Sequence, residues 1–428
     1  MLERLFGLRA AGTDLRRETI AGATTFLTMA YIMFVNPKIL GAAGLDPQAV
    51  FVATCLSAAL TCLIMGLYAN LPIALAPGMG LNAYFAFTAV PALHGDWRLA
   101  LGCVFLSGIL FVIVSLTPLR EWLINAIPKS LKLAIAAGIG FFLALLGFTN
   151  AGVIVASKDT FLAQGVLGDP KVLIAAAAFV LMAALAARKV TGAVLIGIVV
   201  ATLAAVLLHL EPAPGLFALP PSLAPTALQM HFSGAPELIA TSVLVFLLID
   251  MLDTSGTLAG VAHEAGLLDE NGRLPNARRA LAADALGTMI GAALGTSPVT
   301  AYIESAAGVQ AGGRTGLTAV VVALLFLASL FLAPLAGAVP AYATAPALLF
   351  VAALMVRGFA EIDWGDLTEA APALVTALAI PFTFSIAAGM GLGFLTYVAI
   401  KLASGRWREV NAAVAIIALA FLAKIALT

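Results

Sequence analysis

Residues 237–259 read ELIATSVLVFLLIDMLDTSGTLA, an apolar run of membrane-spanning length that contains Asp250 and Asp253. About 20 apolar residues cross a bilayer as a helix, and a carboxylate at its centre costs roughly 2.5–3.5 kcal/mol on insertion scales. Asp253 follows Asp250 by three positions and Thr257 follows Asp253 by four, so the three side chains share one helical face. This polar face predicts a path for a polar solute or a proton rather than a packed core.

The composition of the chain indicates an integral membrane protein. Hydrophobic residues make up 62% of the 428 residues and charged residues 10%, against about 25% charged in a soluble domain. The formal net charge is zero, which argues against a nucleic-acid partner. The three cysteines lie in apolar runs without metal-ligand or disulfide spacing, so we expect no metal and no cofactor.

Two short apolar segments are interrupted by Gly, Pro and small polar residues. They read APGMGLNAYFAFTAV (76–90) and GTSPVTAYIESAAGVQAG (295–312), one on each side of the Pro-rich stretch 211–236. Arg98 precedes Pro118 by twenty positions and Arg314 precedes Pro334 by the same interval, which favours a duplication over chance similarity. Paired interrupted segments in two halves of a chain indicate the binding site of a transporter.

The segment pattern predicts an all-α polytopic membrane protein of 14 transmembrane segments, in two inverted repeats of seven with broken third and tenth segments. With the N-terminus inside, seventeen of the 22 Lys and Arg residues fall on the cytoplasmic side and five outside. The predicted parts are a cytoplasmic N-terminal segment (1–17), the first repeat (18–210), an extracellular linker (211–236), the second repeat (237–404) and a C-terminal hydrophobic segment (405–428). The apolar run 410–427 in the last part either spans the membrane or lies at its interface.

The interrupted segments are expected to carry the chemistry. Pro77 and its neighbouring glycines precede Asn82, and Pro298 precedes Glu304. A half-helix that begins within the membrane offers free N–H donors and a partial positive charge, which suit a planar heterocycle with ring nitrogens and carbonyls. Phe85 supplies an aromatic face. Asn82 has a second interpretation, in which it only caps the half-helix.

Three stretches carry a resemblance to a known family: APGMGLNAYFAF (76–87), DMLDTSGTLAG (250–260) and GTSPVTAYIESAAGVQAGGRTGLTAV (295–320). They resemble the signature regions of the AzgA-like adenine/guanine/hypoxanthine permeases, a branch of the nucleobase:cation symporter-2 (nucleobase–ascorbate transporter) superfamily. The similarity runs from residue 6 to residue 405, nearly the whole chain. It implies an elevator-type transporter of the inner (cytoplasmic) membrane, with a core domain from 18–118 and 237–334, a gate domain from 128–210 and 340–404, and a homodimer through the gate domain.

The resemblance also implies the residues that bind substrate. Asp253 lies where uracil and xanthine relatives carry a substrate-binding glutamate, Glu304 resembles the acid of the tenth segment, and Asn82 matches the asparagine of the third-segment motif. The predicted substrate-binding set is Asp253, Glu304, Asn82, Phe85, Thr257 and Ile303.

The coupling proton needs a different assignment from that of the relatives. Thr257 falls where they carry a proton-linked His or Asp, and its hydroxyl cannot titrate. The predicted proton-coupling residues are therefore Asp250, Asp253 and Glu304, and we expect at least one to be protonated during transport.

These observations predict a proton-coupled symporter that imports adenine, guanine and hypoxanthine. A xanthine or uracil permease is an alternative, although Ser305-Ala306-Ala307 replaces the polar motif of those relatives. An anion carrier of the same fold is another, and it would require a cationic site. An intramembrane enzyme is disfavoured, because no nucleophile or metal-binding set lies within the spans.

Several residues also have a structural interpretation. Asp250 could be an acid satisfied by hydroxyl or backbone groups. Asp284, near a predicted cytoplasmic end, is interpreted equally as a helix cap or interfacial charge and as a functional residue. Thr254 is expected at a helix–helix contact and Tyr31 in core packing.

Overall fold

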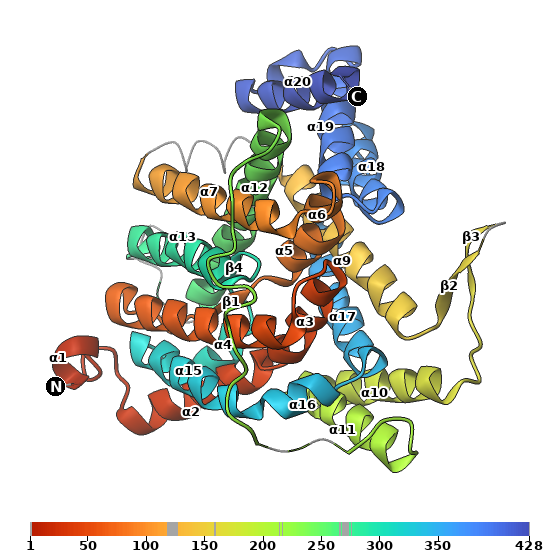
Figure 1. Ribbon diagram of the computed structural model, residues 1–428. Helices are drawn as coiled ribbons and strands as arrows, with labels where there is room; N and C mark the ends of the chain where they lie inside the picture. The colour runs from red at the N-terminus through yellow and green to blue at the C-terminus, as the bar shows by residue number, and fades with distance from the viewer. Residues whose placement is uncertain are drawn as a thin grey trace. The chain divides into compact units, whose positions relative to one another are not determined.

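The structure is a computed structural model that describes residues 2–117, 127–157, 160–213, 215, 217–264, 267, 274 and 276–427. Within these residues, nine helices are long and apolar enough to cross a membrane. The chain divides into two compact units (Figure 1). Unit 1 comprises Met1–Leu116 with Val166–Ala347, and unit 2 comprises Thr117–Gly165 with Leu348–Thr428.

Unit 1 holds both interrupted segments. Its first elements are α1 (Leu2–Phe6), α2 (Leu15–Met29), α3 (Ile32–Ala42), α4 (Pro47–Ile64), a π-helical turn η1 (Met65–Ala69), β1 (Leu75–Pro77), α5 (Met79–Tyr84), a second π-helical turn η2 (Phe85–Ala89), α6 (Val90–Ala92) and α7 (Trp97–Leu116). It continues with α10 (Pro170–Ala187), α11 (Ala193–Leu207), α12 (Pro236–Glu264), α13 (Ala277–Leu294), β4 (Val299–Ala301), α14 (Ser305–Gln310), α15 (Gly316–Ser329), η3 (Leu330–Leu332) and α16 (Ala333–Ala338).

Unit 2 is smaller, and α17 (Ala341–Met355) begins in unit 1 and ends in unit 2. The other elements of unit 2 are α9 (Lys129–Asn150), β2 (Ile154–Ser157), β3 (Phe161–Gln164), η4 (Val356–Glu361), α18 (Leu367–Thr383), α19 (Ile386–Ala403), η5 (Trp407–Glu409) and α20 (Ala412–Leu427). Strands β2 and β3 form an antiparallel hairpin.

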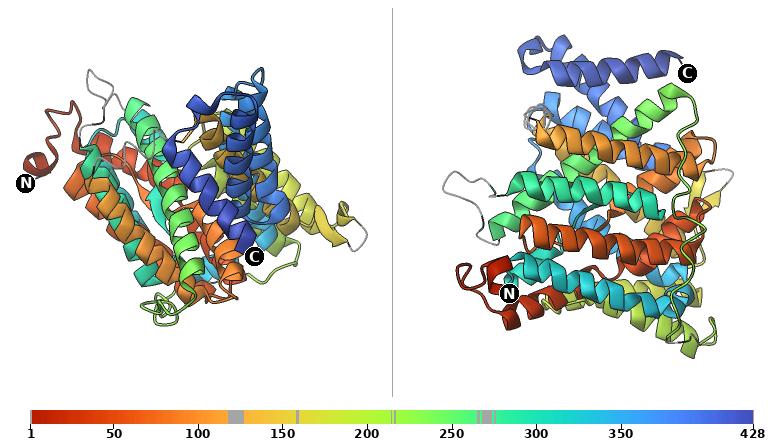
Figure 2. Two further views of the ribbon diagram at one scale, coloured as in Figure 1. Left: turned by 90° about the horizontal axis from the view of Figure 1, so that it is seen from above. Right: turned by 60° about the vertical axis from the view of Figure 1, so that its left-hand side comes forward.

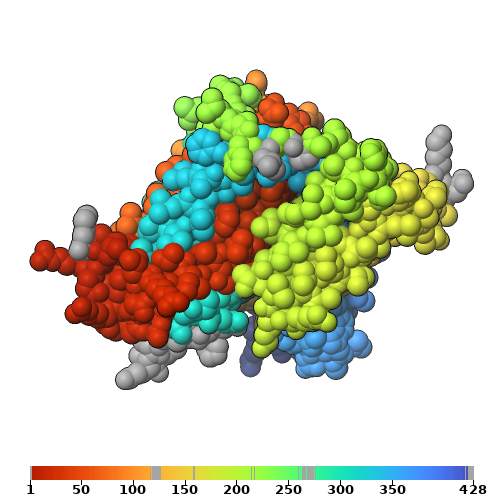
Figure 3. Space-filling view, turned by 90° about the horizontal axis from the view of Figure 1, so that it is seen from below, coloured from red at the N-terminus to blue at the C-terminus, as the bar shows by residue number. Residues whose placement is uncertain are grey.

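Helices from the two halves of the sequence alternate in unit 1. The order α7, α13, α4, α15, α2 is a row in which each helix packs against the next (Figure 2). Helix α2 also packs against α11, and Figure 3 shows the red α2 beside the yellow-green α11 on one face. Glycines permit the closest approach in the row, since a Cβ on Gly66 would lie 2.5 Å from the carbonyl oxygen of Gly316. Small residues at helix contacts are typical of membrane proteins.

Polar caps fix where the helices begin. Asp46 caps α4 by accepting from Ala49 N, and Asp169 caps α10 by accepting from Lys171 N. Each aspartate precedes a proline that occupies the first helical position. Within unit 1 the fully buried Glu18 of α2 accepts hydrogen bonds at the start of a different helix, α15. Its carboxylate accepts from Arg314 N at 2.9 Å and from Thr318 Oγ1 at 2.6 Å, so the start of α15 is tied to α2.

The prediction of a helical membrane protein is confirmed, with one addition. Two short two-stranded sheets are present, which an all-α architecture does not include. The apolar run 410–427 forms helix α20. The count of fourteen segments and the core and gate boundaries stay predictions, and Pro118, which the repeat comparison used, lies outside the described residues.

Candidate functional site

The interrupted segments meet inside unit 1 as a pair of antiparallel strands, β1 and β4 (Figure 1). The register sets Leu75 opposite Ala301, Ala76 opposite Thr300 and Pro77 opposite Val299. The pairing is extended at its ends by bonds from Gly78 N to Pro298 O and from Tyr302 N to Ala74 O, both 3.0 Å. Extended backbone within a membrane must find its partners in the protein, and each strand supplies them to the other.

A short helix follows each strand, α5 after β1 and α14 after β4. Gly78 is the N-cap residue of α5. A Cβ at this position would lie 2.5 Å from Thr300 Cγ2, so a side chain here would push the strands apart. The breaks predicted in the third and tenth segments are thus present, and they bring the two half-helices to one place.

Asn82 lies inside α5 and is fully buried. Its Oδ1 accepts a hydrogen bond from Ser297 Oγ, whereas its Nδ2 has no hydrogen-bond partner. Because Gly78 holds the cap position, the interpretation of Asn82 as a helix cap is wrong. The side chain instead joins the first half-helix to the residues before β4 and keeps one amide donor unpaired.

Glu304 immediately precedes α14 and is half-buried. Tyr31 Oη donates to its Oε1 at 2.6 Å, and Thr28 Oγ1 donates to its backbone oxygen at 3.4 Å. The next residue, Ser305, accepts a hydrogen bond from Ala74 N at 3.0 Å. The carboxylate is therefore held by Tyr31, at the start of α3, and the backbone around it is held from α2 and from the chain before β1. The expected packing role of Tyr31 did not include this contact of its hydroxyl group.

Helix α12 contributes Asp250, which is 1% exposed. Its Oδ2 accepts from Thr288 Oγ1 of α13 at 2.7 Å, and its Oδ1 has no hydrogen-bond partner. The hydroxyl of Thr300 also interacts with this carboxyl group. The interpretation of Asp250 as an acid satisfied by hydroxyl or backbone groups therefore holds for one oxygen and leaves Oδ1 without a partner.

Asp284 of α13 is the residue that the sequence left open between a functional and a structural role. It is fully buried, and it accepts from Thr254 Oγ1 at 2.8 Å and from Ala301 N of β4 at 2.9 Å. The bond from Thr254 joins α12 to α13, which confirms the helix contact expected of Thr254, and Thr254 also hydrogen-bonds Thr300 Oγ1 of β4 at 2.6 Å. Asp284 is not a helix cap or an interfacial charge; a further sequence signal for it is its (i, i+4) spacing to Thr288.

Asp253 completes a group that we call the four acids: Asp250, Asp253, Asp284 and Glu304. Asp253 is half-buried, and its charge interacts with those of Glu304, Asp250 and Asp284. In the part of the chain that the structure describes, none of the four acids forms an ion pair. Like charges at this depth destabilise one another unless a proton or a ligand with donor groups joins them.

The remaining predicted residues have different surroundings. Phe85 is fully buried, with its ring centroid 6.4 Å from that of Phe246. Thr257 is buried on α12, and Ile303, next to Glu304, is 47% exposed. Among the described residues, no group of three or more His, Cys, Asp or Glu side chains is placed to hold a metal ion.

Comparisons with known proteins identify the family of the chain. A family model described as "Permease family" (Xan_ur_permease) matches residues 16–426. Putative permease MJ0326 of Methanocaldococcus jannaschii is 52% identical over 98% of this chain and 97% of its own length. Adenine permease AdeP of Escherichia coli is 48% identical over 99% and 96%, and guanine/hypoxanthine permease PbuO of Bacillus subtilis is 43% identical over 97% and 98%.

Solved structures share the fold at low sequence identity. The transmembrane domain of a cyanobacterium bicarbonate transporter, BicA, has a TM-score of 0.69 at 17% identity and covers 87% of this chain and 97% of that one. The structure of SLC26A9 has a TM-score of 0.67 at 11% identity and covers 91% and 66%.

Proposed function

The chain belongs to this permease family, and on that premise we propose that it imports the purine nucleobases adenine, guanine and hypoxanthine together with a proton. It is a multi-pass protein of the cell membrane, and a transporter rather than an enzyme. The names of its relatives support purines, because they include adenine permeases and guanine/hypoxanthine permeases over almost the full chain. As in the sequence prediction, the protein is proposed to work as a homodimer.

The observation that carries the proposal is the meeting of acids without a countercharge and an unpaired donor at two half-helices. Asp253 and Glu304 interact electrostatically, neither forms an ion pair with a described residue, and the buried Nδ2 of Asn82 has no hydrogen-bond partner. A purine offers the complementary set, with ring N–H or exocyclic amine donors and with ring nitrogen or carbonyl acceptors. Glu304 and Asp253 would accept from the donors, and Asn82 would donate to an acceptor.

Asp250 is proposed to take part in coupling, since it has one oxygen without a hydrogen-bond partner and no countercharge among the described residues. A protonated Asp250 would satisfy that oxygen with its own hydrogen. With Asp250 protonated, the transporter would carry a smaller buried charge when it moves the purine across the membrane.

Thr257 and Ile303 are proposed to line the substrate site, and Phe85 to support the substrate from the packed side.

The test is uptake of radiolabelled hypoxanthine and adenine by cells that express the protein and lack their own purine carriers. We expect saturable uptake that a protonophore abolishes, and weak competition by uracil and xanthine. Equal competition by uracil or xanthine would contradict the purine assignment. Uptake that survives the protonophore but follows a sodium gradient would contradict coupling to a proton.

The anion-carrier alternative draws on the solved structures, one of which is the transmembrane domain of a bicarbonate transporter. At 17% and 11% identity they show the fold alone. Bound anions require positive charge, whereas the ionisable side chains described at the half-helices are acidic. We expect bicarbonate and chloride to leave hypoxanthine uptake unchanged at concentrations at which adenine blocks it.

A further inference from the structure

Tyr31 holds the carboxylate of Glu304 from one side. Its side chain is 1% exposed, and its hydroxyl donates to Glu304 Oε1 at 2.6 Å. The backbone around it is fixed as well, because Tyr31 O accepts from Phe34 N at 3.0 Å and from Val35 N at 3.1 Å as α3 begins. A short O–H···O⁻ bond is among the stronger hydrogen bonds in proteins.

This contact limits how Glu304 can meet a solute. A free glutamate side chain rotates and can present both oxygens to a ligand. With Oε1 bound to a buried, rigid phenol, the carboxylate loses that freedom, and one lone pair of Oε1 is already engaged. The two oxygens of Glu304 are therefore no longer equivalent, and Oε1 is a weaker acceptor for a solute than a free carboxylate oxygen would be.

We propose that Tyr31 is a positioning residue that sets purine specificity through Glu304, an inference that rests on the proposed function. Guanine carries two neighbouring donors, a ring N–H and an exocyclic amine, which match a carboxylate with both oxygens free. Hypoxanthine presents a single ring N–H on that edge, and adenine a single exocyclic amine. A carboxylate with one oxygen already engaged therefore favours hypoxanthine and adenine over guanine.

The test compares Tyr31→Phe with the unaltered protein in labelled uptake, normalised to the amount of folded transporter in the membrane. Without the Tyr31 hydroxyl, Glu304 is no longer oriented and its charge-assisted hydrogen bond to the base is weakened. KM for hypoxanthine should therefore rise roughly 5–30-fold, with a smaller change in maximal rate. The KM for guanine should rise by less, so the preference for hypoxanthine over guanine should fall by at least about threefold. Equal changes for both bases, or none, would overturn the proposal.

Tyr342→Phe is the matched control. Tyr342 is also buried in unit 1, and its hydroxyl donates to a glutamate, Glu211 Oε1, at 3.3 Å. This variant loses the same chemical contact away from the four acids, and we expect its KM values for both bases to be unchanged. A rise in KM equal to that of Tyr31→Phe would show that the effect of Tyr31 is general to buried tyrosines and would overturn the proposal.

A double-mutant cycle separates positioning from direct contact with the base. If Tyr31 acts through Glu304, Tyr31→Phe should change affinity less than about twofold in a Glu304→Ala background. The full effect in that background would overturn the proposal. Tyr31→Met, of similar length without a hydroxyl, replaces Tyr31→Phe if that variant fails to accumulate. Failure of the unaltered protein to take up any purine would instead contradict the proposed function.

Discussion

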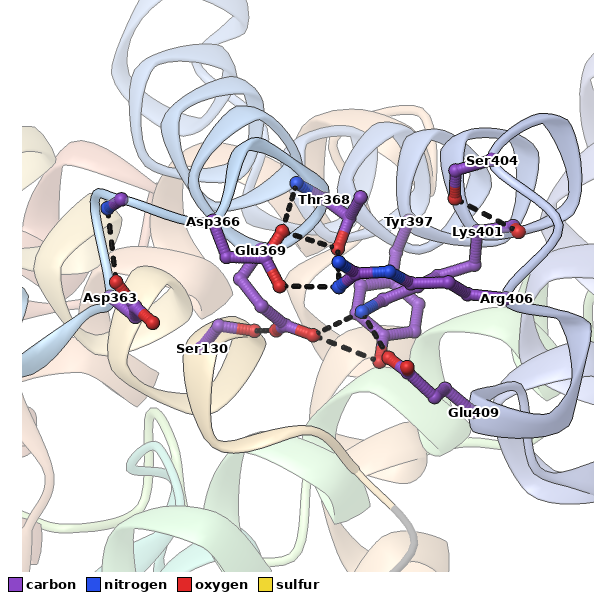
Figure 4. Close-up of polar contacts among 11 residues, drawn as sticks. Ser130, Asp363, Asp366, Thr368, Glu369, Tyr397, Lys401, Ser404, Arg406 and Glu409 are labelled. Atoms are coloured by element: carbon purple, nitrogen blue, oxygen red, sulfur yellow. Dashed lines mark hydrogen bonds and ion pairs between the residues drawn. The ribbon is translucent and has the colours of Figure 1, made fainter.

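Units 1 and 2 both bury ionisable groups, and they neutralise them differently. In unit 2, the fully buried Lys401 bonds Glu369 Oε1 at 2.7 Å and Glu409 Oε2 at 2.5 Å, while Ser130 Oγ donates to Glu369 Oε2 (Figure 4). In unit 1, the four acids form no ion pair with any described residue. Unit 2 therefore carries its own countercharge.

The difference separates structural from functional burial of charge. A buried ion pair with its hydrogen bonds satisfied needs nothing from outside, and its loss affects folding. Carboxylates without a countercharge need a proton or a ligand with donor groups, and their loss affects what the protein binds. The comparison predicts that substitutions in unit 1 alter transport and substitutions in unit 2 alter stability.

The largest effect is expected at Asp253. Asp253→Asn should abolish concentrative purine uptake, because the amide neither titrates nor keeps the charge that interacts with Glu304. Proteoliposomes with an imposed pH gradient provide the measurement, with purine counterflow as the control for a folded site. A double Asp250→Asn, Asp253→Asn variant that still concentrates purine would exclude both α12 acids as the coupling site.

Lys401→Met should destabilise the protein by about 3 kcal/mol, at the low end for a broken buried ion pair because Glu409 is half exposed. Thermal unfolding in detergent measures the loss. Adding Glu369→Gln removes one of the stranded charges and should restore part of the stability. A Lys401→Met variant that folded normally but lost transport would contradict the expectation that substitutions in unit 2 alter stability.

Glu304→Gln should weaken purine binding by about 10–150-fold, the loss of a charge-assisted hydrogen bond worth roughly 1.5–3 kcal/mol. The melting temperature without purine should not fall, because the substitution removes an uncompensated charge. Competition against labelled hypoxanthine gives the affinity. Unchanged affinity would show that Glu304 does not bind the purine.

The smallest effect concerns Asp366, at the start of α18 outside the spans. Hydrogen bonds from the Thr368 hydroxyl and backbone N–H, and then from Arg406, lower the pKa of Asp366 to about 2. A lowered folded-state pKa gives stability that is present above about pH 4 and lost as the pH falls toward 2. The difference in melting temperature between the unaltered protein and Asp366→Asn should shrink over that range; a constant difference would contradict this.

The sequence predicted the features that depend on nearby residues. The polar face of α12 follows from the three- and four-residue spacing of Asp250, Asp253 and Thr257, and glycine and proline mark both interrupted segments. The sequence did not predict that those segments pair as strands. Three residues are too few for a strand pattern, and the partners of β1 lie in the other half of the chain.

The surroundings of Asp284 and Lys401 could not be predicted, for the same reason. Asp284 lies close to Arg278 and Arg279 in sequence, which suggests a cytoplasmic helix end, but its partners come from α12 and β4. Lys401 follows an apolar segment, where the charge pattern predicts a cytoplasmic cation, yet the fold buries it between two glutamates. Local spacing can show that a side chain is polar in an apolar segment, but distant residues decide whether it is neutralised.

The pairing of β1 with β4 has a consequence for biogenesis. Ala74 N and Ser305 Oγ, which flank the pair, are 231 residues apart, so the ribosome must reach β4, in the second half of the chain, before β1 has a partner. In the folded protein Cys62 Sγ contacts the N–H and the carbonyl of Leu75, which is only one residue of the strand. A chain that stops before residue 301 leaves bare backbone in the lipid, so we expect such nascent fragments to be degraded rather than to persist as half-carriers.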